Sequence, residues 1–148
     1  SFATIYLSPK DYHRIHMPFD GRLKLMKYIP GNLFSVNQRT VNNIDQVFAR
    51  NERLICNFNT EYGEIALVMV GAIFVGSMET SWEGKVTPPY TKSVKTFDYD
   101  SRQIDLFKGE ELGRFNMGST VILLMPKGSP DLNLETGQIL KMGQSISN

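Results

Sequence analysis

Hydrophobic and polar residues alternate along most of this chain, in short stretches that glycine, proline and asparagine separate. A period of two places successive side chains on opposite faces, so each stretch predicts a half-buried β-strand. Asp20-Gly21 and Pro30-Gly31 are typical turn sequences between such strands. The predicted strands cover residues 2–7, 22–25, 52–58, 64–70, 78–86, 92–99, 121–124 and 138–142.

One segment has a different period. Val41, Ile44, Val47 and Phe48 recur at helical spacing, which predicts one short helix over residues 40–50. Short strands, frequent glycine and proline, and little other helical periodicity favour an all-β fold. We expect a mainly antiparallel barrel- or sandwich-like core with one or two short helices, forming a single domain over residues 1–148.

Composition narrows the function classes. A chain of 148 residues with 41% hydrophobic and 21% charged residues can bury a normal core. The net charge of +1 provides no strong basic field, so we expect no nucleic-acid partner. A single cysteine, Cys56, excludes an internal disulfide, and its alternating surroundings predict a buried thiol. The chain begins at Ser1 on a predicted strand, so we expect it to be a fragment or to lack its leading part.

The most distinctive stretch is a Gly-Ser-Thr step that leads directly into a stiff apolar strand. Gly118 has no Cβ atom, so its carbonyl group can be approached closely. The hydroxyl group of Ser119 is a potential nucleophile beside that carbonyl. The predicted strand that follows would hold the step in a fixed frame, although a turn feeding a core strand would have the same pattern.

The only two histidines of the chain are His13 and His16. Metal binding would need further ligands, and Asp11 alone does not complete such a site, so we predict no metal. The pair could instead fix a loop by hydrogen bonds. It could also perform acid–base chemistry, because an imidazole titrates at about pH 6.5.

Several segments together resemble the phosphatidylserine decarboxylases. They occur in the family's order over nearly the whole chain, and their combination is highly specific. The Gly-Ser-Thr step also resembles the family's Leu-Gly-Ser-Thr motif, with Met117 in place of leucine, a change that nearly conserves volume. The resembling segments are residues 6–18, 30–37, 48–53, 70–72 with 75–77, and 108–115.

This resemblance implies a self-cleaving precursor. The bond between Gly118 and Ser119 would break, so that residues 1–118 form the C-terminal part of the large chain and residues 119–148 the small chain. Ser119 would become a covalently bound pyruvoyl group. This cofactor would form a Schiff base with the amine of phosphatidylserine and would allow its decarboxylation to phosphatidylethanolamine.

The resemblance also assigns roles to individual residues. It assigns His16 to the activation of Ser119 during self-cleavage, in a triad with an aspartate. His13 would handle the substrate carboxylate or the reprotonation, and Ser35 and Val36 would line the headgroup pocket. The family's aspartate belongs to an upstream Ala-Asp-Gly segment, which this chain does not contain, and Asp20-Gly21 is not a substitute for it.

At the cellular level, the resemblance implies a homodimer of processed protomers. It also implies a peripheral protein on the cytoplasmic face of the inner membrane, although the family's N-terminal amphipathic helices are not in this chain. Two other functions stay open: a pyruvoyl-dependent decarboxylase for a related phospholipid, and a non-catalytic domain that binds phospholipid headgroups. A serine hydrolase is not expected, because Ser119 lacks a Gly-x-Ser-x-Gly elbow.

Overall fold

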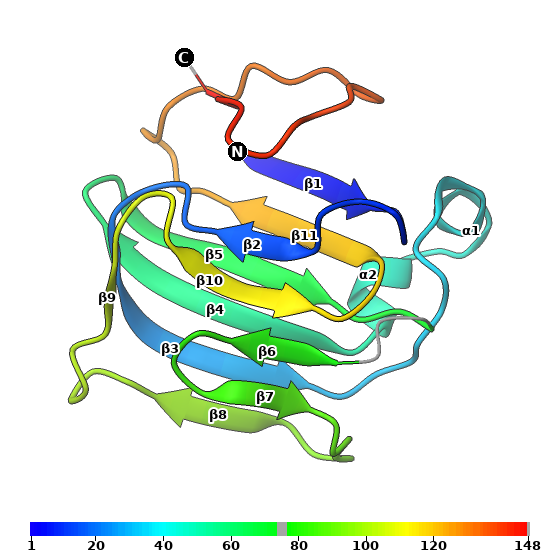
Figure 1. Ribbon diagram of the computed structural model, residues 1–148, viewed down its shortest axis with the longest axis horizontal. Helices are drawn as coiled ribbons and strands as arrows, with labels where there is room; N and C mark the ends of the chain where they lie inside the picture. Colours follow the sequence, from blue (N-terminus) through cyan, green and yellow to red (C-terminus); the bar gives the residue numbers. More distant parts are fainter. Residues whose placement is uncertain (74–76, 148) are drawn as a thin grey trace.

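Two antiparallel β-sheets lie face to face in the computed structural model, which describes residues 1–73 and 77–147 (Figure 1). Val75 and Gly76, part of one resembling segment, lie outside the described residues. The elements in chain order are β1 (Phe2–Leu7), β2 (Arg14–His16), β3 (Gly21–Ile29), α1 (Gln38–Asn43), α2 (Val47–Arg50), β4 (Arg53–Thr60), β5 (Gly63–Val70), β6 (Met78–Thr80), β7 (Gly84–Thr87), β8 (Lys95–Asp98), β9 (Asp105–Leu106), β10 (Glu111–Phe115) and β11 (Ser119–Leu124).

The larger sheet has seven strands in the order β1-β11-β5-β4-β3-β8, with β9 also paired to β3. The smaller sheet has the order β2-β10-β6-β7. Over the residues that the structure describes, neither sheet closes into a barrel, so the sandwich-like form of the predicted all-β fold is the correct one. Neither of the two helices in this part of the chain has the length and apolarity needed to cross a bilayer.

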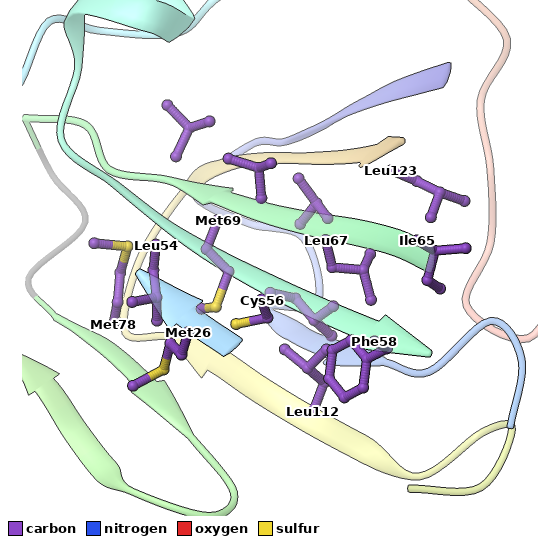
Figure 2. Close-up of a cluster of buried hydrophobic side chains, with 14 of the residues drawn as sticks. Met26, Leu54, Cys56, Phe58, Ile65, Leu67, Met69, Met78, Leu112 and Leu123 are labelled. Atoms are coloured by element: carbon purple, nitrogen blue, oxygen red, sulfur yellow. The ribbon is translucent and has the colours of Figure 1, made fainter. Parts of the chain in front are cut away.

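The core lies between the two sheets and is built from every second residue of the strands. Leu54, Cys56 and Phe58 of β4 are completely buried on the inner face. The smaller sheet contributes Met78 and Leu112 to the same cluster (Figure 2). Burying one such large apolar side chain contributes about 1.5–3 kcal/mol, so this shared core holds the two sheets together.

Most of the predicted strands are confirmed. The first predicted strand is β1, and the two predicted around the turn at residues 59–63 form the β4–β5 hairpin. The strand predicted before Pro30 is β3, and the apolar strand after the Gly-Ser-Thr step is β11, which begins at Ser119 itself. Cys56 is buried, as its alternating surroundings predict.

Three local predictions are wrong. The single helix over residues 40–50 is two helices, because Ile44 is extended and Gln46 has a left-handed backbone with φ of 56°. The single strand over residues 78–86 is the β6–β7 hairpin. Residues 138–142 form no strand, because this segment lies on the surface, where Ile139 is 88% exposed.

Candidate active site

The Gly118–Ser119 step lies where the chain crosses from the smaller sheet to the larger one. Residues 116–118 connect the end of β10 to the start of β11, which lies between β1 and β5. Figure 1 shows this end of the sandwich on the right, where β1 and β5 end and where α1 and α2 lie. The step is therefore held by both sheets at once.

Gly118 is packed tightly against the segment that follows β1. A Cβ atom on Gly118 would lie 3.0 Å from the backbone nitrogen of Pro9 and 3.1 Å from the carbonyl oxygen of Leu7. Both atoms belong to the backbone and cannot rotate away. The absence of a side chain at Gly118 is thus what allows this close approach.

Changing Gly118 to alanine should therefore disturb the step itself. We expect the added methyl group to displace the backbone of residues 118–119, at a cost of about 1–3 kcal/mol. A displacement of about 1 Å can slow a positioned reaction by about 100-fold. If the bond after residue 118 breaks in the wild type, it should break at least about 100-fold more slowly in Gly118→Ala. Mass spectrometry over time measures both cleavage rates. An unchanged rate would contradict the importance of this contact.

Ser119 is fully buried, and its hydroxyl group has no hydrogen-bond partner in the structure. Its side chain shares the inner face of β11 with Val121 and Leu123, because alternate residues of a strand face the same side. A buried hydroxyl without a partner costs stability, so such a group is typical of a site where chemistry takes precedence over stability. The neighbouring Thr120 hydroxyl is also buried and unpaired.

The structure brings His13 to the same end of the sandwich. Its backbone carbonyl accepts a hydrogen bond from the amide of Phe115, at 3.0 Å, just before the crossover. Its ring nitrogen Nε2 lies 3.2 Å from the carbonyl oxygen of Pro9, the residue that packs on Gly118. The other ring nitrogen, Nδ1, is buried and unpaired. His13 thus has one ring nitrogen available for a reacting group.

His16 is held differently. Its Nδ1 lies 2.7 Å from the carbonyl oxygen of Gly109, and its Nε2 lies 2.8 Å from the hydroxyl group of Tyr12. It pairs with Glu111, at the end of β10 away from the crossover. The structure therefore forms no hydrogen bond between His16 and Ser119. In the part of the chain that the structure describes, no three His, Cys, Asp or Glu side chains gather as a metal site.

Ser35 and Val36 lie in an irregular segment that Asn51 holds against the sheet. Asn51 is fully buried, accepts a hydrogen bond from the amide of Phe34, and donates to the carbonyl oxygens of Phe34 and Gly71. Gly71 directly follows β5, whose last residue pairs with Thr120. Val36 is buried and Ser35 is half-buried, so of these two residues Ser35 has the more accessible side chain.

Changing Asn51 to alanine should loosen this segment. The substitution leaves one amide and two carbonyl groups unpaired in a buried setting, which should cost about 2–4 kcal/mol of unfolding free energy. Urea unfolding followed by tryptophan fluorescence measures this loss. The matched control is Asn57→Ala, because Asn57 makes a single exposed hydrogen bond to Glu64 and should change stability by less than about 1 kcal/mol. Equal losses in the two variants would contradict this role for Asn51.

Glu52 is a buried carboxyl group at this end that reasoning from the sequence missed. It is 2% exposed, and its Oε2 accepts a hydrogen bond of 3.0 Å from the hydroxyl group of Tyr28. Burial raises the pKa of Glu52, and the bond from Tyr28 opposes that rise. Burial and this bond raise the pKa of Tyr28 to about 12. The sequence does contain one indication of this burial, because Glu52 continues the alternation of inner-facing residues in β4.

The chain is similar to known proteins along its whole length. The family model described as phosphatidylserine decarboxylase matches residues 1–148. A phosphatidylserine decarboxylase proenzyme of Francisella philomiragia is 58% identical over 130 residues, which cover 86% of this chain and 46% of that protein. The proenzyme of Acidovorax ebreus is 51% identical over 150 residues, covering 100% of this chain and 53% of the relative.

A further proenzyme of the same name, from Nitrosococcus oceani, is 54% identical over 151 residues, covering 98% of this chain and 48% of the relative. The chain spans about half the length of the curated relatives that it matches. A match along the whole chain, together with identities above 50%, leaves a single assignment. The chain belongs to the phosphatidylserine decarboxylase family.

Proposed function

We propose that this chain is the catalytic domain of a phosphatidylserine decarboxylase precursor that cleaves itself between Gly118 and Ser119. The observation that carries the proposal is the buried, unpaired hydroxyl group of Ser119, placed directly after a glycine whose backbone is fixed by Leu7 and Pro9. Family membership supports the same function, since the relatives are named as proenzymes of this decarboxylase.

Self-cleavage starts with the attack of the Ser119 hydroxyl oxygen on the carbonyl carbon of Gly118. An oxygen–carbon bond forms, the amide bond between the two residues breaks, and the hydroxyl proton ends on the nitrogen of Ser119. A base then removes the proton on the Cα atom of residue 119. The carbon–oxygen bond breaks, and Gly118 leaves as a carboxylate. Loss of ammonia after addition of water leaves a pyruvoyl group at residue 119.

The surroundings of residue 119 suit such a group. The position is buried, lies on the inner face, and begins a strand that is hydrogen-bonded to neighbours on both sides. When present, the ketone would supply an electron sink for the loss of carbon dioxide from the substrate. His13 is then the group best placed to hold the substrate carboxylate or to return a proton, because its Nδ1 is free.

The proposed substrate is a lipid, so we also propose that this end of the protein docks on a membrane surface as a peripheral protein. Met117, two residues before Ser119, is 46% exposed, and Ile73, two residues after Gly71, is 59% exposed. Exposed apolar side chains beside a site for a lipid headgroup favour contact with the acyl boundary. Ser35 and Val36 would then lie beside the headgroup.

The mass of the purified full-length protein tests this function. Denaturing mass spectrometry should detect two pieces, the smaller one beginning at residue 119 and lacking a free amine. Borohydride treatment in the presence of phosphatidylserine should add the mass of the lipid to this smaller piece. A single unbroken chain that still releases carbon dioxide would contradict the proposal. A single unbroken chain without activity would favour the non-catalytic headgroup-binding alternative.

A further inference from the structure

A row of polar side chains lies on the smaller sheet beside the crossover from β10 to β11. Arg114 of β10 pairs with Glu79 of β6. The ladder extends past both strands, because the amide of Asn116 donates a hydrogen bond of 3.2 Å to the carbonyl oxygen of Ser77. Phe115, between the two polar residues of β10 and the crossover, belongs to the core. Because alternate residues of a strand share a face, the four polar side chains lie on the face away from the core.

Hydrogen bonds join these four side chains. Both Nε and Nη2 of Arg114 donate to Oε2 of Glu79, at 2.9 and 2.6 Å. The other carboxylate oxygen of Glu79, Oε1, accepts a bond of 3.2 Å from Nδ2 of Asn116. The same Nδ2 donates to the hydroxyl group of Ser77. Both hydrogens of the Asn116 amide group are thereby used, and the backbone amide adds a third bond to the segment that begins β6.

Asn116 and Gly118 are the two fixed ends of the crossover. The backbone of Gly118 packs against Leu7 and Pro9, whereas Asn116 is bonded to the smaller sheet. The one residue between them, Met117, is 46% exposed. Two residues span at most about 7 Å. Fixing Asn116 therefore leaves the carbonyl group of Gly118 little freedom to turn.

Self-cleavage depends on the direction of that carbonyl group, because the attacking oxygen must approach its carbon atom along one path. We propose that Asn116 is a positioning residue for self-cleavage: its bonds to Ser77 and Glu79 hold the crossover in the conformation from which Ser119 attacks Gly118. This inference rests on the proposed function and adds to it a residue that acts through the backbone. It leaves the assignment of the base unchanged.

The first test is the rate of self-cleavage in the full-length precursor carrying Asn116→Ala. Confining one residue to a single backbone conformation corresponds to a factor of about 5–30, so we expect cleavage to slow by about 10-fold. After complete cleavage, the variant should decarboxylate phosphatidylserine with the kcat and KM of the wild type, because Asn116 acts on the uncut chain. Mass spectrometry over time measures cleavage, and release of carbon dioxide measures decarboxylation.

The matched control is Asn57→Ala. Asn57 also donates to a glutamate, Glu64, whose carboxylate is bonded to a cation, Lys24. This group lies near the β4–β5 turn, at the end of the sandwich opposite the crossover (Figure 1). The control should be cleaved at the wild-type rate.

Three results of this first test would overturn the inference. They are wild-type cleavage in Asn116→Ala, equal slowing in Asn57→Ala, and an equal loss of decarboxylation in fully cleaved Asn116→Ala, which would indicate a general structural defect. A wild-type precursor that never breaks would instead overturn the proposed function. The two failures are therefore distinguishable.

The second test exchanges the two partners. Asn116→Asp places a second carboxylate beside that of Glu79, and their repulsion should slow cleavage by at least about 10-fold. Adding Glu79→Gln to this variant provides an amide group on β6 that can donate to the new carboxylate, so cleavage should recover. The second substitution would not reverse a general loss of folding. Wild-type cleavage in Asn116→Asp, or a double variant that is equally slow, would overturn the proposal even if Asn116→Ala did not fold.

Discussion

Replacing Ser119 with alanine should leave the full-length precursor as one unbroken polypeptide that releases no carbon dioxide from phosphatidylserine. The variant lacks the oxygen that would attack the Gly118 carbonyl carbon. The fold should survive the change. Because the Ser119 hydroxyl is buried and unpaired, its removal can add about 1 kcal/mol of stability rather than subtract it.

Denaturing mass spectrometry tests whether the chain stays unbroken, and a carbon dioxide assay tests the loss of decarboxylation. Urea unfolding measures the change in stability. The matched control is Ser129→Ala, since Ser129 also carries a buried hydroxyl group without a partner, after β11. This control should break like the wild type. A Ser119→Ala chain that still separates into two pieces at residue 118 would disprove the assignment of the nucleophile.

The second large effect concerns the two histidines, which we expect to act at different stages. Following the family resemblance, His16→Ala should leave the precursor uncut, whereas His13→Ala should be cut but should lose most of its decarboxylation. An acid–base residue typically contributes about 10²–10⁴-fold, so each loss should be at least about 100-fold. A gel measures the first effect and release of carbon dioxide the second.

The two histidines have different surroundings in the structure. His13 contacts the Pro9 carbonyl beside Gly118 and keeps Nδ1 free, whereas both ring nitrogens of His16 are engaged by Gly109 and Tyr12. A Tyr12→Phe variant removes one partner of His16 without touching the ring, so it serves as the control for a purely structural effect. The opposite pattern, with His13 needed for cutting and His16 for decarboxylation, would disprove this division.

Alternation along the chain was sufficient to predict most of the fold. A strand that buries one face must carry its apolar residues at every second position, as Leu54, Cys56 and Phe58 do in β4. Alternation alone does not reveal a turn inside an apolar stretch, which is why it predicts one strand where the structure has the β6–β7 hairpin. Helical spacing likewise does not reveal a residue with a left-handed backbone, so it does not predict the break between α1 and α2 at Gln46.

The candidate site could be predicted only in part. Local sequence and family resemblance predict Gly118, Ser119 and His13 as site residues, and the structure brings them to one end of the sandwich. The position of the buried Glu52 beside Tyr28 and Gly71 depends on the pairing of three strands that are distant in the chain. Strand register follows from long-range packing, so no local pattern around Glu52 indicates its neighbour.

The position of β11 inside the larger sheet bears on how the protein would behave after a break at residue 118. β1 is bonded to β11 over its whole length on one side, and β5 is bonded to it on the other. The released fragment could not dissociate without disrupting both ladders and the apolar contacts beneath them. A nicked molecule should thus elute from gel filtration as one particle and melt in one transition, its two polypeptides separating only in denaturant.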